Sequence, residues 1–72
     1  MNTVLITTDF ITLGQFLKYI GAISNGSEAK NYLVSNKIYV NNEFETRRGR
    51  KIYPGFTVKI GNKSYFIVKN DN

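Results

Sequence analysis

Apolar residues first follow a strand pattern and then a helical spacing. Residues 3–7 (Thr-Val-Leu-Ile-Thr) are apolar and β-branched, which predicts a first strand. Four apolar residues then recur at intervals of three and four positions, as one face of a helix requires. They are Leu13, Phe16, Leu17 and Ile20. Thr12 and Gln15 match a capping box at the start of this helix, and Gly21 predicts its end.

A second helical segment follows a loop in which we expect Ile23 to face inward. Ser27 is the predicted N-cap, and Glu28 falls in the first turn, where the helix dipole favours an acidic side chain. Asn36 is a candidate for a left-handed residue that ends the helix. The residues expected to face the core are Ala29, Tyr32 and Leu33.

Short strands account for the remainder of the chain. Asn41 and Asn42 predict a two-residue hairpin turn, and Pro54-Gly55 fits the middle of a type II turn. We expect the polar tail, residues 69–72, to fray. The predicted strands are residues 38–40, 43–45, 56–60 and 64–68. This order predicts an α+β fold, with two packed helices on one face of a small, mostly antiparallel twisted sheet of four to five short strands.

Composition narrows the class of function. The 72 residues suit a single domain, residues 1–72, and ten basic against five acidic residues give a net charge of +5. That charge favours a polyanionic partner. Cysteine and histidine are both absent, which removes disulfides, thiolate metal sites and the commonest general base. We therefore expect no enzyme, no metal and no cofactor. Without a signal-like or membrane-spanning apolar segment, a cytoplasmic protein is the simplest interpretation.

Positive charge is concentrated in the basic segment, residues 47–51. It contains four cations around one glycine: Arg47, Arg48, Gly49, Arg50 and Lys51. No acidic residue occurs between Glu45 and Asp71, so mutual repulsion is costly unless an anion offsets it. Gly49 lets the backbone take a positive φ and come close to a partner, and planar arginine forks suit phosphate. The alternative is a solvated loop whose charge serves only solubility.

The stretch from residue 12 to residue 58 resembles the ribosomal protein S-four-type RNA-binding domain, also called the αL motif. The likeness rests on three blocks in order: residues 13–18, residues 27–33, and residues 38–42 followed by the basic segment and residues 53–58. Small stand-alone YaaA-like members look most similar. They share Ile-Thr-Leu-Gly-Gln-Phe-Leu-Lys at residues 11–18 and Arg-Arg-Gly-Arg-Lys at residues 47–51. The resemblance implies an RNA-binding fold in which both helices and the following loop form one basic face.

Lysines on the helices extend this candidate face. Lys18 and Lys30 lie off the core-facing sides of their helices, where they can flank a groove that the basic segment closes. The asparagine turn can hydrogen-bond sugar or base edges and also form the hairpin. The candidate RNA-binding residues are therefore Lys18, Lys30, Asn41, Asn42, Arg47, Arg48, Gly49, Arg50 and Lys51.

Aromatic residues allow two interpretations. Tyr19, Tyr39 and Tyr53 are the polar aromatics nearest the face, and each can stack on a base or be partly buried, with burial favoured. A second group is assigned mostly to packing: Phe16, Tyr32, Phe44, Phe56 and Phe66.

The leading hypothesis is a monomeric, non-catalytic protein that binds structured RNA, either ribosomal RNA or a ribosome assembly intermediate, with ribosomal particles as a further candidate partner. It involves neither a membrane nor a small-molecule substrate. The alternative is a protein-interaction module whose basic face docks an acidic surface of a replication, repair or ribosomal partner. The RNA hypothesis fails if the arginines are splayed apart, or if the molecule's own carboxylates neutralise them and no concave surface is shared.

Overall fold

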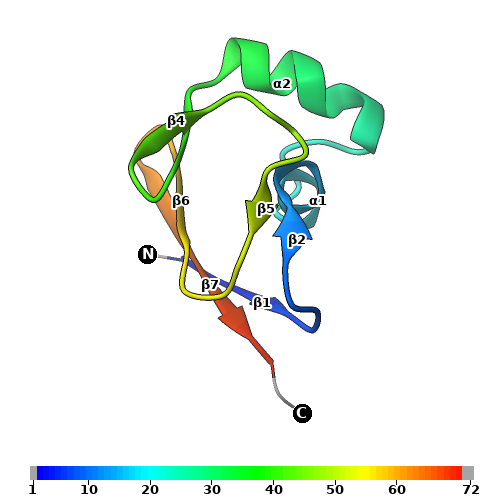
Figure 1. Ribbon diagram of the computed structural model, residues 1–72. Helices are drawn as coiled ribbons and strands as arrows, with labels where there is room; N and C mark the ends of the chain where they lie inside the picture. Colours follow the sequence, from blue (N-terminus) through cyan, green and yellow to red (C-terminus); the bar gives the residue numbers. More distant parts are fainter. Residues whose placement is uncertain (1, 71–72) are drawn as a thin grey trace.

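Two short α-helices lie on one side of a curved sheet in the computed structural model, which describes residues 2–70 (Figure 1). The helices are α1 (Leu13–Tyr19), the 3₁₀ helix η1 (Gly26–Glu28) and α2 (Ala29–Ser35). The strands are β1 (Asn2–Ile6), β2 (Ile11–Thr12), β3 (Ile38–Val40), β4 (Glu43–Glu45), β5 (Lys51–Ile52), β6 (Thr57–Ile60) and β7 (Lys63–Lys69). The predicted α+β class is confirmed. No helix within the described range has the length and apolar composition that a membrane crossing needs.

Five strands form the main sheet in the order β1-β7-β6-β3-β4. All neighbours are antiparallel except β1 and β7, which run parallel with Val4 opposite Ile67. The β3–β4 hairpin turns at Asn41 and Asn42, whose φ angles of 52° and 69° confirm the predicted left-handed pair. Phe56 N–H donates to the Tyr53 carbonyl at 3.1 Å around the Pro54-Gly55 turn, as predicted.

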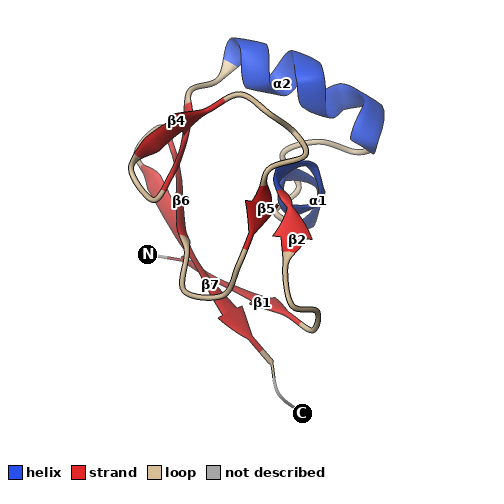
Figure 2. Cartoon of the chain, viewed as in Figure 1, coloured by secondary structure: helices blue, strands red, loops and turns tan. Residues whose placement is uncertain are grey.

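A second, two-stranded sheet was not expected from the sequence. β2 pairs antiparallel with β5, so that Ile11 lies opposite Ile52 and Thr12 opposite Lys51. Figure 2 shows this pair beside α1, away from the main sheet. It joins the end of the basic segment to the residue that caps α1, and it therefore fixes the loop next to the helix.

The core lies between the helices and the inner face of the main sheet. Both helices contribute apolar side chains, as their spacing predicted, and Ile23 is buried as expected. The eight largest fully buried side chains are Phe16, Leu13, Leu17, Ile38, Ile52, Ile67, Val40 and Val58. Within residues 2–70, Glu45 is the one charged residue that is buried.

Two predictions about the second helix are wrong. Asn25, and not Ser27, caps this segment: its Oδ1 accepts from Ser27 N–H at 3.1 Å and from the Ser27 hydroxyl, because the chain enters through the 3₁₀ turn before α2 begins. Asn36 is extended, with a φ of −132°, because β3 starts two residues later. Its side-chain amide donates instead to the Tyr32 carbonyl at 3.0 Å.

The outer face of the sheet is more exposed than the sequence suggested. Phe44 and Phe66 were assigned to packing, yet both are exposed, because they alternate with inward-facing neighbours on strands that no helix covers on that side. Of the predicted tail, Lys69 ends β7 and its Nζ lies 2.9 Å from Asp9 Oδ1. Residues 71–72 lie outside the described range.

Candidate nucleic-acid interface

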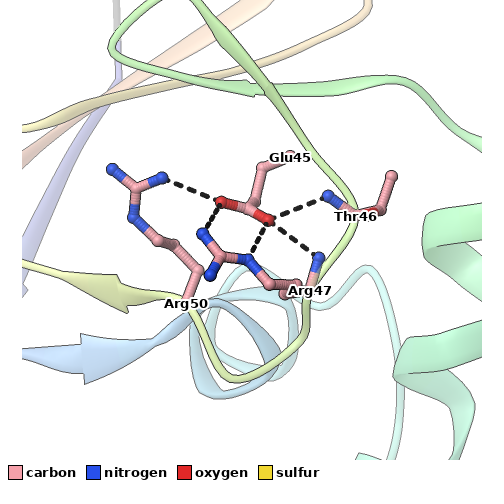
Figure 3. A network of polar contacts seen from close by, with 4 residues as sticks. All are labelled: Glu45, Thr46, Arg47 and Arg50. Atoms are coloured by element: carbon pink, nitrogen blue, oxygen red, sulfur yellow. Dashed lines mark hydrogen bonds and ion pairs between the residues drawn. The ribbon is translucent and has the colours of Figure 1, made fainter.

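A buried carboxylate organises the loop between β4 and β5. Glu45 Oε2 accepts hydrogen bonds from the N–H groups of Thr46 and Arg47, at 3.0 and 2.9 Å, and from Arg47 Nε at 3.0 Å (Figure 3). Its Oε1 accepts from Arg47 Nη2 at 3.1 Å and from Arg50 Nη1 at 2.8 Å. Five donors on one carboxylate therefore hold both arginines and the loop backbone in a single arrangement.

These contacts lower the pKa of Glu45 to about 2. The Arg47 side chain is the largest cause, and burial opposes the shift without cancelling it. Glu45 thus stays ionised at neutral pH and offsets one of the four positive charges in the basic segment. Residues 45–51 keep a net charge of +3.

The two paired arginines keep most of their hydrogen-bonding capacity. A guanidinium has five N–H groups. Glu45 uses two of those on Arg47 and one of those on Arg50. Arg47 remains 72% exposed at its side chain, so its remaining donors reach solvent. The pairing with Glu45 therefore orients both arginines, and it leaves Arg47 at the surface while the Arg50 side chain stays 24% exposed.

Backbone bonds dock the same loop on α1. Leu13 N–H donates to the Arg50 carbonyl at 2.8 Å, and Gly14 N–H donates to the Arg48 carbonyl at 2.9 Å. Thr12 Oγ1 accepts from Gln15 N–H at 3.2 Å, and the Gln15 side chain accepts from Thr12 N–H at 2.8 Å, so the predicted capping box is confirmed. The first backbone N–H groups of α1 therefore already have hydrogen-bond acceptors within the protein. An anion would be attracted by the cations of the loop and not by the N-terminus of the helix.

Two hollows lie beside the loop. We call the first the helix-side hollow, and its volume is about 390 Å³. It is lined by Thr12, Gly14, Gln15, Lys18, Gly26, Ala29, Arg48 and Gly49. Lys18 and Arg48 have no carboxylate partner in the described part of the chain. Two unpaired cations thus border a concave surface made by α1, the start of η1–α2 and the loop.

We call the second hollow the aromatic-side hollow. Its volume is about 570 Å³, and it shares Gly49 with the helix-side hollow. It is lined by Arg47, Gly49, Arg50, Lys51, Tyr53 and Phe56. Lys51 Nζ also lies 5.1 Å from the centroid of the Phe10 ring, within range of a cation–π interaction. A larger hollow, of about 1020 Å³, lies between residues 5–12 and α1 and shares Lys18, but its lining is mainly apolar.

Other candidate residues lie apart from the two hollows or have structural roles. Lys30 is exposed on α2 but lines neither hollow. The Asn41-Asn42 turn precedes β4, whereas the basic segment follows it, so the two lie at opposite ends of that strand. Asn41 Oδ1 also accepts from Thr57 N–H at 2.9 Å.

Gly49 does not use the positive φ that a glycine permits, since the glycines with positive φ in the described range are Gly21, Gly55 and Gly61. A β-carbon at Gly49 would meet nothing within 4 Å, so neither its φ nor close packing requires a glycine here. The loop turns instead through the bond from Arg50 N–H to the Arg47 carbonyl, 3.2 Å long.

Sequence reasoning missed Glu45 and gave too little weight to Tyr53. The alternation of side chains along β4 could have revealed Glu45. Glu45 lies opposite the buried Ile38, whereas the preceding residue, Phe44, points outward. Partial burial was favoured for the tyrosines; Tyr39 is half-buried, but Tyr19 and Tyr53 are exposed.

No cluster of three potential metal ligands occurs among the residues that the structure describes.

Comparison with known proteins gives two matches that span this surface. A family model described as "S4 domain" matches residues 4–68, which include the helices, the basic segment and strands β3 to β6. The chain is also 45% identical over 69 residues to the "Probable ribosome maturation protein RlbA" of Bacillus subtilis (strain 168). That alignment covers 96% of this chain and 97% of the relative.

Proposed function

Because this chain belongs to the S4 domain family, we propose that it is a non-catalytic protein that binds structured RNA, either ribosomal RNA or a ribosome assembly intermediate. Family membership and the identity to a protein named for ribosome maturation support a ribosome-related RNA-binding role. The proposal adds the surface: α1, the start of η1–α2 and the basic segment form one basic face. A cytoplasmic monomer that acts on ribosomal particles fits this role.

One observation carries the proposal: Lys18 and Arg48 border the helix-side hollow without any carboxylate partner in the described chain. They come from different elements, and the bond from Gly14 N–H to the Arg48 carbonyl fixes their backbones relative to one another. Cations held on a rigid concave surface can match phosphates of a folded RNA in three dimensions. Arg47, Arg50 and Lys51 continue the positive surface around Gly49.

Salt-dependent binding tests this face directly. We expect the K18A/R48A variant to bind a structured ribosomal RNA more weakly. The slope of log affinity against log salt should become shallower by up to about 1.8, at roughly 0.7–0.9 for each of two lost phosphate contacts. Lys18 and Arg48 are preferable to Arg47 and Arg50, whose removal would leave Glu45 buried with fewer partners.

The matched control is K59A/K63A, which makes the same change in net charge at two exposed lysines that line neither hollow. This control should retain most of the wild-type slope. Equal slopes for K18A/R48A and wild type would contradict the proposed face.

The protein-interaction alternative predicts a different outcome in a pull-down from cell extract. If RNA mediates the association, treatment with ribonuclease releases the ribosomal material recovered with the wild-type protein. Recovery of an acidic protein that survives ribonuclease and is lost with K18A/R48A would favour the alternative.

A further inference from the structure

The aromatic-side hollow combines positive charge with exposed rings. Three of its six lining residues are cations, two are aromatic, and none is acidic. Its volume of about 570 Å³ is in the range of pockets that hold small ligands, roughly 300–1,000 Å³. The helix-side hollow, in contrast, has no aromatic lining. The two hollows therefore suit different parts of a ligand.

Tyr53 is fixed in position and open to solvent. Ile52 before it is fully buried, so alternation turns the Tyr53 side chain outward, and the residue is 40% exposed. Its ring centroid lies 5.4 Å from that of Phe10 and 5.6 Å from that of Phe56, with interplanar angles of 46° and 58°. The two neighbours brace the tyrosine at a tilt and do not stack parallel to it.

Cations surround this ring from the loop side. Arg47 and Arg50 keep N–H groups that Glu45 does not use, and Lys51 begins the strand that leads to Tyr53. Because the carboxylate holds both guanidinium groups, their position relative to the ring costs little further conformational entropy on binding. A ligand with a planar aromatic part next to a phosphate matches this arrangement.

We propose that the aromatic-side hollow binds one unpaired nucleotide, splayed out of a structured RNA, with its base stacked on Tyr53 and its phosphate on Arg47, Arg50 and Lys51. This inference rests on the proposed function and specifies its partner: the RNA carries a bulged or looped nucleotide beside the helical part that contacts the helix-side hollow. A continuous duplex cannot use Tyr53, since its bases stack on one another.

Two short RNA hairpins of the same stem test the inference, one with a single bulged 2-aminopurine and one fully paired. We expect wild-type protein to bind the bulged hairpin about 5- to 150-fold more tightly, the range for stacking of one base, and to quench its fluorescence. Y53F keeps the ring and should keep the preference. Y53L should lose both the preference and the quenching, with a salt slope unchanged from wild type.

A change in the RNA alone guards against a folding defect in Y53L. An abasic residue at the bulge removes the stacking base and leaves the protein intact, so it should remove the preference of the wild-type protein. Retention of the preference with the abasic hairpin would overturn the inference. Equal binding of the bulged and paired hairpins, still weakened by K18A/R48A, would overturn the nucleotide site alone. No effect of K18A/R48A on either hairpin would contradict the proposed function itself.

Discussion

At the scale of single residues, Glu45 decides how the basic segment is displayed. Four cations in five positions repel one another, and an unstructured loop would lower that repulsion by spreading them apart. The buried carboxylate holds Arg47 and Arg50 through charge-assisted hydrogen bonds instead. Arg48 and Lys51 have no carboxylate partner in the described chain and face the two hollows. One acidic residue thus orders a surface that remains positive.

Replacing Glu45 tests this role. E45Q should lower the free energy of unfolding at neutral pH by about 1–3 kcal/mol, because a neutral amide cannot replace the charge-assisted bonds to both arginines. The matched control is E43Q, the same substitution at an exposed residue of the same strand, with an expected change within about 0.5 kcal/mol. Urea denaturation of both variants measures the difference. Equal stabilities would show that the network contributes nothing to folding.

The same carboxylate predicts acid sensitivity. Its pKa is about 2 in the folded protein and about 4.5 when unperturbed, so its stabilisation is fully present above pH 4.5 and is lost as the pH falls towards 2. The loss is at most about 3 kcal/mol, and less than that because Arg47 is largely exposed. The stability difference between wild type and E45Q should therefore shrink from pH 5 to pH 2. A constant difference would contradict the assigned cause.

Glu45 and Tyr53 also show what single-residue reasoning lacks. Alternation alone places Glu45 inward, but only the fold shows that the loop turns back so that Arg50, five residues on, reaches it. Tyr53 is exposed because β2 pairs with β5 and buries Ile52, a pairing of two-residue strands with too little sequence to predict. At Gly49 the residue type permits a positive φ without requiring one, and the loop does not adopt it.

At the scale of elements, local signals gave correct predictions at the start of the first helix and at the β3–β4 hairpin turn. The capping box at Thr12 and the asparagine turn each depend on residues at most three positions apart, and both are confirmed. The sequence placed the cap of the second helix at Ser27, whereas the structure has it at Asn25. A 3₁₀ turn places the cap two residues earlier than Ser27, and nothing in the helical spacing of Ala29, Tyr32 and Leu33 reveals that turn.

Asn25, the observed cap, and Ser27, the predicted one, make a matched pair of variants. N25A removes the acceptor of Ser27 N–H and should reduce stability by about 1 kcal/mol, the usual cost of losing a cap. S27A removes only the hydroxyl partner of Asn25 and should cost less, since the backbone bond remains. Thermal unfolding of the two variants at one pH measures the order. A larger loss for S27A would restore Ser27 as the cap.

At the scale of the whole molecule, long-range pairings assemble the proposed basic face. β1, near the N-terminus, pairs in parallel with β7, near the C-terminus. β2 pairs with β5, so that Ile11 lies opposite Ile52 although the two are far apart in the sequence. The sequence predicted the helices, the hairpin and the α+β class. It could not predict these two pairings, because each depends on closure of a long segment and not on local residue preference. The position of Lys18 beside Arg48 follows from them.

The central claim is that RNA contacts the face made by α1, the start of η1–α2 and the basic segment. The most direct measurement is a titration of the isotope-labelled protein with structured ribosomal RNA, followed by backbone amide NMR. We predict that the largest shifts cluster at residues 14–18 and 47–53, whereas the amides of Phe44 and Phe66 on the outer sheet face change little. Shifts confined to the outer sheet face, with residues 47–53 unaffected, would contradict the account.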